Sequence, residues 1–87
     1  MTAADYEPGV IELVAELVEL PPEDLDPTVP FADAGVDSLV AMEIIVHLEA
    51  QYAVRFEDTD AKQARTIRDL AALVAGRRAA QEAAGGG

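Results

Sequence analysis

The chain has 87 residues, enough for one domain, and its seventeen acidic and six basic residues give a formal net charge of −11. Hydrophobic residues make up 51% of the sequence, which excludes a disordered acidic tail because they suffice for a core. With no cysteine, the chain has no disulfide, thiolate zinc site or cysteine nucleophile. The acidity argues against nucleic acid and anionic membranes as partners.

The acidic charge is concentrated in the first part of the chain. Residues 1–54 contain twelve acidic and no basic residues, and all six basic residues fall in 55–87. A basic partner would therefore approach the first part preferentially. The start of the chain lacks the features of a secretory signal, and the longest uncharged apolar run, 70–75, is too short to cross a bilayer. We expect a cytoplasmic protein with no membrane partner.

The first predicted helix begins near Pro8, a residue type favoured in the first turn, and ends before Pro21 and Pro22. Its apolar residues follow helical spacing, and its glutamates share the opposite face. Residues 21–37 hold four of the five prolines, which predicts a long loop. Four apolar side chains are expected to pin this loop to the core: Leu25, Val29, Phe31 and Val36.

The second helix is predicted from Asp37 or Ser38 to Tyr52, and it carries apolar residues on two sides. One side is a complete core face: Ala41, Ile44, Ile45, Leu48 and Tyr52. The other is a second apolar stripe, flanked by glutamates: Leu39, Met42, Val46 and Ala50. This stripe is either exposed for protein docking or packed beneath the first loop or the next helix, and periodicity does not separate the two.

A short helix is expected around Thr59–Ala64, and the last helix opens at a capping box formed by Thr66 and Asp69. That helix ends at Gly76 or frays beyond it. We therefore predict a single domain over 1–87, with about 8–76 ordered and a frayed tail at 77–87. The fold class is all-α, a small bundle of three main helices plus one short helix, with a long first loop.

Ser38 lies at the start of the second helix, where a helix cap is the simplest role. A hydrolase elbow is excluded because Gly35 lies three residues before the serine rather than two. The single histidine, His47, lies nine residues along the same helix, at a rise of about 13 Å, too far to act as a base. A calcium loop from Asp58 is excluded because Lys62 takes a ligand position. The residues predict a non-catalytic protein whose helix N-terminus favours a phosphate at the serine.

The segment FADAGVDSLVAMEIIVHLEAQYAVRF resembles the signature region of acyl carrier proteins, centred on Asp37-Ser38-Leu39. The resemblance extends over nearly the whole chain, from the acidic first helix to the capped fourth. It implies an acyl-carrier-like bundle in which Ser38 holds 4′-phosphopantetheine, transferred from coenzyme A by a separate Mg²⁺-dependent phosphopantetheinyl transferase. The thiol of that arm would carry acyl groups as thioesters, and the chain would be a substrate of enzymes rather than an enzyme.

The resemblance also implies two sets of contact residues. Basic patches on an acyltransferase, a ketosynthase or an acyl or aminoacyl ligase would dock on Asp37, Leu39, Met42, Glu43, Val46 and Glu49. Acyl chains in some members fold back between the second and third helices, which here implies a pocket near Ile44, Leu48, Phe56 and Ala61.

The segment with Met42-Glu43, Leu48-Glu49 and Tyr52 resembles the discrete carriers of polyketide or related specialised pathways more closely than fatty-acid carriers. Val40 is apolar where many fatty-acid carriers have an acid, and Arg55 places a positive charge before Phe56. A fatty-acid carrier and a carrier of an aminoacyl starter unit remain alternatives. So does a different class of protein, an acidic helical adaptor in which Ser38 is only a cap. Since the chain begins with Met1 and holds one domain, we expect a stand-alone, monomeric carrier.

Overall fold

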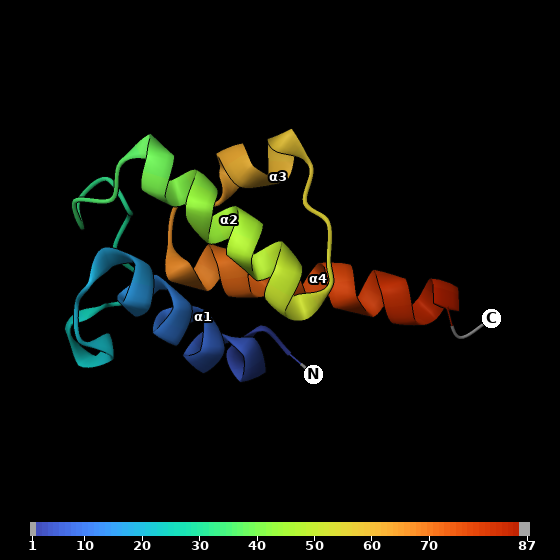
Figure 1. The fold of residues 1–87 in the computed structure, drawn as a ribbon. Coiled ribbons are helices and arrows are strands. Elements are labelled where there is room, and N and C mark those ends of the chain that lie inside the picture. The colour runs from blue at the N-terminus through green and yellow to red at the C-terminus, as the bar shows by residue number, and fades with distance from the viewer. Residues whose placement is uncertain (1, 86–87) are drawn as a thin grey trace.

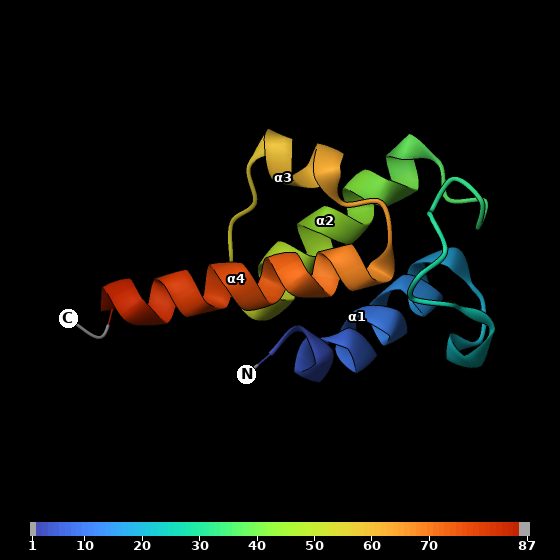
Figure 2. The ribbon, with the colours of Figure 1, turned by 180° about the vertical axis from the view of Figure 1, so that it is seen from behind.

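The computed structural model describes residues 2–85, and within that range the chain is helical with no β-strand. The elements in chain order are α1 (Ala3–Val18), a 3₁₀ turn (Pro22–Asp24), α2 (Ser38–Tyr52), α3 (Asp58–Gln63) and α4 (Ile67–Gly85). Figures 1 and 2 show the short α3 on the side of α2 away from α1. The predicted fold class, three main helices plus one short helix after a long first loop, is confirmed.

The core lies between the three long helices. α1 packs most extensively against α4, and α2 packs against both. The buried cluster draws on all three helices: Tyr6, Val10, Val14, Ile44, Leu48, Ile67, Leu70, Ala71 and Val74. The first loop packs against this cluster as expected, through Leu25, Phe31 and Val36. These three side chains and Val29 also line a small cavity of about 190 Å³ beneath the loop.

α1 begins at Ala3, so the prediction that it begins near Pro8 is wrong. Thr2 N donates to Asp5 Oδ2 at 2.7 Å, and this capping interaction starts the helix upstream. The bond also lowers the pKa of Asp5, mainly through the backbone N–H of Thr2. Pro8 therefore lies inside the helix, where it gives up one backbone donor.

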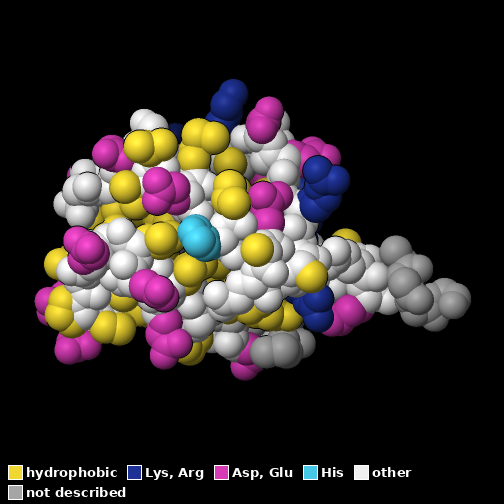
Figure 3. Space-filling view, in the orientation of Figure 1, with side chains coloured by type: hydrophobic (Ala, Val, Ile, Leu, Met, Phe, Trp, Pro, Cys, Tyr) yellow, Lys and Arg dark blue, Asp and Glu magenta, His cyan; other side chains and the backbone are white. Residues whose placement is uncertain are grey.

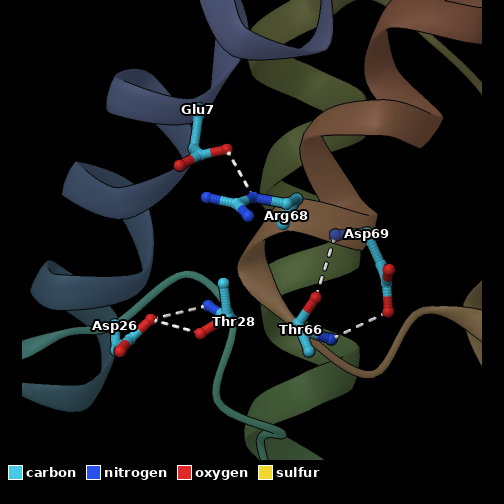
Figure 4. Close-up of polar contacts among 6 residues, drawn as sticks. All are labelled: Glu7, Asp26, Thr28, Thr66, Arg68 and Asp69. Atoms are coloured by element: carbon cyan, nitrogen blue, oxygen red, sulfur yellow. Dashed lines mark hydrogen bonds and ion pairs between the residues drawn. The ribbon is translucent and has the colours of Figure 1, made fainter.

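A local turn and one backbone bond hold the first loop against the start of α4. Thr28 donates to Asp26 Oδ1 from its hydroxyl at 2.7 Å and from its backbone N at 2.9 Å, as Figure 4 shows. These bonds, the hydroxyl first, lower the pKa of Asp26. Arg68 N then donates to the Pro27 carbonyl at 3.0 Å, so the loop is fastened to the helix that follows it much later in the chain.

The predicted capping box at the start of α4 is confirmed. Asp69 N donates to Thr66 Oγ1 at 3.0 Å, and Thr66 N donates to Asp69 Oδ2 at 3.2 Å (Figure 4). In the first turn of α4, Arg68 Nε donates to Glu7 Oε2 of α1 at 3.3 Å. Residues 66–69 thus fix both the start of α4 and its contact with α1.

α4 does not end at Gly76 but continues to Gly85, so the helix is longer than its shorter predicted form. The part of α4 beyond Gly76 is held by contacts with the end of α2, which a local sequence pattern cannot predict. Arg78 Nη1 donates to the Tyr52 carbonyl at 3.2 Å, and Gln81 Nε2 donates to the Ala53 carbonyl at 2.8 Å. Carbonyls at the end of a helix lack hydrogen-bond donors within that helix, and here side chains of α4 supply donors to the carbonyls at the end of α2. The last part of the predicted tail, 86–87, lies outside the described residues.

Because α4 is helical through Gly76, replacing that residue by alanine should stabilise the protein by about 0.5–1 kcal/mol. A Cβ added at Gly76 meets no atom within 4 Å, so only the gain in helix propensity remains. Gly9 is the matched control, since a Cβ there would collide with the hydroxyl of Tyr52 and alanine should bring no such gain. Urea unfolding of the two variants measures this. A lower stability for Gly76→Ala would contradict the helical extension.

Candidate functional site

The candidate site is the N-terminus of α2, where the long first loop delivers Ser38 as the first helical residue (Figure 1). Gly35 adopts a φ of 79° in the turn just before it, a conformation that favours glycine. Asp37 is the N-cap, and its Oδ1 accepts a hydrogen bond from Val40 N at 2.9 Å. Since Asp37 caps the helix, a role for Ser38 as the cap is contradicted. The serine side chain is exposed to solvent.

Ser38 opens onto a groove between α2 and α3 with a volume of about 440 Å³. The α2 wall is built from Ser38, Ala41, Met42 and Ile45, and the α3 wall from Asp58, Ala61 and Lys62. The side chains deeper on α2 are apolar, and charged groups stand only on α3. This geometry suits a flexible, partly apolar chain attached at the serine oxygen.

The four residues expected in an acyl pocket do not all face this groove. Only Ala61 lines it. Ile44 and Leu48 are each 0% exposed because they point into the core between α1, α2 and α4. Phe56 is half-buried and packs against that core. At 100° per residue, the face of α2 toward α3 is the neighbouring one, which carries Ala41, Met42 and Ile45 instead.

The second apolar stripe of α2 is exposed, so the alternative that it packs beneath the loop or the third helix is wrong. Leu39, Met42 and Val46 are 68%, 67% and 59% exposed, although Met42 also reaches the edge of the groove. The flanking Glu43 is exposed as well. Figure 3 shows this face, on which hydrophobic side chains alternate with acidic ones and basic groups lie toward the edges. An apolar strip with a charged rim is typical of a protein-docking surface.

Glu49 has a structural role that the sequence did not reveal. Its Oε2 accepts a hydrogen bond from Phe56 N at 3.0 Å, and the side chain is half-buried. The chain reverses at Ala53, which ends α2 with a left-handed φ of 54°, and the reversal brings Phe56 back over the last turn. Glu49 therefore fastens the connection between α2 and α3, in addition to standing at the rim of the stripe.

α3 carries a second interaction that sequence patterns missed. Asp60 Oδ2 accepts from Glu57 N at 3.0 Å and pairs with the guanidinium of Arg77 on α4. The Glu57 backbone bond and then Arg77 lower the pKa of Asp60 below its ordinary value. Seventeen residues separate Asp60 from Arg77, so only the packing of the helices brings them together.

Other candidate chemistry does not assemble in the part of the chain that the structure describes. His47 is exposed on α2, nine residues beyond Ser38. Residues 2–85 contain no group of three or more His, Asp or Glu side chains that could hold a metal ion. None of the described helices combines the length and the hydropathy that crossing a membrane requires.

Comparison with known proteins identifies the family. The family model of the phosphopantetheine attachment site matches residues 8–74. The acyl carrier protein of Acidothermus cellulolyticus is 32% identical over 68 residues, covering 77% of this chain and 81% of that protein. The chain therefore belongs to the acyl carrier proteins, carriers whose prosthetic group is 4′-phosphopantetheine.

Further relatives come from longer proteins. The meromycolate extension acyl carrier protein of Mycobacterium tuberculosis is 33% identical over 67 residues, or 76% of this chain and 58% of that protein. The highly reducing polyketide synthase pks5 of Leptosphaeria maculans is 37% identical over 68 residues, 78% of this chain but only 3% of the synthase. Among solved structures, the A1-type ACP domain from module 5 of MLSA1 superposes with a TM-score of 0.75 at 26% identity, covering 88% of this chain and 82% of that one.

Proposed function

We propose that Ser38 is the attachment residue for 4′-phosphopantetheine, and that the chain presents acyl groups to partner enzymes of polyketide or related specialised biosynthesis. The observation that carries the proposal is the position of Ser38, exposed as the first residue of α2 and lining the groove between α2 and α3. It is also the only serine in the chain.

The surroundings of Ser38 fit a phosphodiester. Backbone N–H groups and the helix dipole at the start of α2 favour a negative group on the serine oxygen. Lys62, in the wall of the same groove, adds a positive charge that offsets the nearby carboxylates of Asp37 and Asp58. When bound, the group supplies a terminal thiol for acyl transfer, which this cysteine-free chain lacks.

The apolar part of the groove is the proposed resting place of the acyl chain. Ala41, Met42 and Ile45 offer methyl and thioether surface beside the attachment point, with Ala61 facing them from α3. Burying apolar cargo there removes it from water, which stabilises the loaded protein in proportion to the area covered.

The pathway assignment rests on relatives and on two residues. One relative is a polyketide synthase and others are meromycolate extension acyl carrier proteins. The apolar Val40 and the Arg55 charge depart from many fatty-acid carriers. Loading the pantetheine-bearing protein with purified acyltransferases and acyl or aminoacyl ligases tests the assignment. We expect transfer of acyl units used in polyketide assembly. Exclusive loading with an amino acid or a long fatty acid would overturn it.

The proposed docking surface consists of the exposed stripe with its acidic neighbours: Asp37, Leu39, Met42, Glu43, Val46 and Glu49. Carboxylates at the rim would steer a basic partner, while the apolar centre would supply the contact area.

Reversing one rim charge with Glu43→Lys should slow association with a partner enzyme, because steering by the acidic face weakens. The effect should shrink as the salt concentration rises. Stopped-flow association at low and high salt measures it, with Glu12→Lys on the exposed face of α1 as a control of equal charge change. Equal association rates for Glu43→Lys and the wild type at low salt would contradict the surface. Glu49→Lys is less informative because it also removes the acceptor for Phe56 N.

A further inference from the structure

α3 forms one wall of the groove but is anchored less firmly than the long helices. None of the residues of α3, Asp58–Gln63, is fully buried, whereas α1, α2 and α4 all contribute to the core. Its flanks are attached on either side. Phe56 N binds Glu49 before the helix, and after it the Arg65 carbonyl accepts from Phe31 N at 2.8 Å. The position of the helix between these two attachments depends on polar contacts.

The contact that reaches α3 itself comes from the extension of α4. Arg77 pairs with Asp60, whose side chain is only 17% exposed, so the pair is partly shielded from solvent. Arg78, the next residue of α4, and Gln81, about one turn further on, donate to the carbonyls at the end of α2. Residues 77–81 of α4 therefore contact both α2 and α3, the two helices that form the walls of the groove.

We propose that Arg77 is a specificity-determining residue for the acyl cargo, because it holds α3 at a set distance from α2. The inference rests on the proposed function of Ser38 and of the groove. Ala61 and Lys62 follow Asp60 directly and line the groove across from Met42. Any movement of Asp60 therefore changes the space open to a chain attached at Ser38. With the pair in place the groove has a volume of about 440 Å³. Loss of the pair should let α3 move and change that volume.

Hydrogen exchange of the full chain without its prosthetic group tests whether Arg77 holds α3. In Arg77→Gln, the amides of α3 should exchange about two- to fivefold faster. The reason is that loss of the ion pair with Asp60 makes local opening of α3 easier, and an ion pair of this exposure contributes only modestly to stability. Arg77→Lys should restore part of the protection. Arg68→Gln is the matched control, since Arg68 pairs with Glu7 on the far side of the bundle and α3 should not respond. Unchanged exchange of α3 in Arg77→Gln would overturn the inference.

The same measurement on protein loaded with an octanoyl-pantetheine analogue tests the link to cargo. We expect octanoyl to slow exchange in α3 of the wild type and to do so less in Arg77→Gln. Equal slowing in both proteins would overturn the role of Arg77 in selecting cargo. No slowing in the wild type would refute the groove as the resting place of the chain, and the cargo role with it. The comparison without the prosthetic group is independent of the proposed function, so the two failures are distinguishable.

Discussion

Replacing Ser38 by alanine should abolish attachment of phosphopantetheine and leave the bundle folded. The hydroxyl oxygen is indispensable to a phosphodiester, whereas its loss removes little from the fold because the side chain is exposed. Loss of a helix cap costs about 1 kcal/mol, and here the cap is Asp37, which the substitution retains. Intact mass after coexpression with a promiscuous phosphopantetheinyl transferase, together with a thermal melt, measures both effects.

The exposed hydroxyl of Thr59, close to the groove wall on α3, provides the control. Thr59→Ala should be modified as fully as the wild type. An adduct on Ser38→Ala would show that Ser38 is not the attachment residue. Since the chain has no other serine, the group would then have to be attached to a different residue type.

Ile44→Ala should destabilise the protein by about 2–5 kcal/mol, as expected for truncation of a fully buried aliphatic side chain. Ile44 is 0% exposed and contacts the central cluster from α2. A loss of this size is a large fraction of the stability of so small a domain. Thermal or urea unfolding measures it, and lowered stability should appear whether or not the prosthetic group is attached.

Met42, two residues earlier, is the matched comparison because the helix turns it to a different face. Its side chain is 67% exposed, so Met42→Ala should leave the melting temperature nearly unchanged. An unbranched thioether suits adaptable contacts with partners, and its loss should slow acyl transfer to or from a cognate enzyme. If Met42→Ala destabilised the protein as much as Ile44→Ala, the exposed stripe would be part of the core and the docking surface would be misplaced.

The features that the sequence predicted correctly are those set by local geometry. α2 begins and ends where expected because Asp37 caps it and the apolar period fixes its faces. Thr66 and Asp69 mark the start of α4 in the same way. The 100° turn per residue also places Ile44 and Met42 on different faces of α2, and the structure shows that the face of Met42 is the exposed one.

The features that were missed depend on how separate helices meet. The groove residues other than Ala61 could not be chosen without knowing which face of α2 turns toward α3. Glu49 reaches Phe56, and Arg77 reaches Asp60, only because the chain folds back on itself. The early start of α1 is different. Thr2 and Asp5 show the same spacing as the correctly predicted capping box of α4, so a signal was present in the sequence.

We propose that this acyl carrier protein bears its prosthetic group on Ser38. The most direct test is proteolytic digestion of the wild-type chain after incubation with coenzyme A, Mg²⁺ and a phosphopantetheinyl transferase, followed by mass spectrometry of the peptides. We expect one phosphopantetheine on the peptide that contains Ser38, with fragment ions that place it on the serine. An unmodified Ser38 peptide under conditions that fully modify a known carrier, or a group located on one of the threonines, would contradict the account.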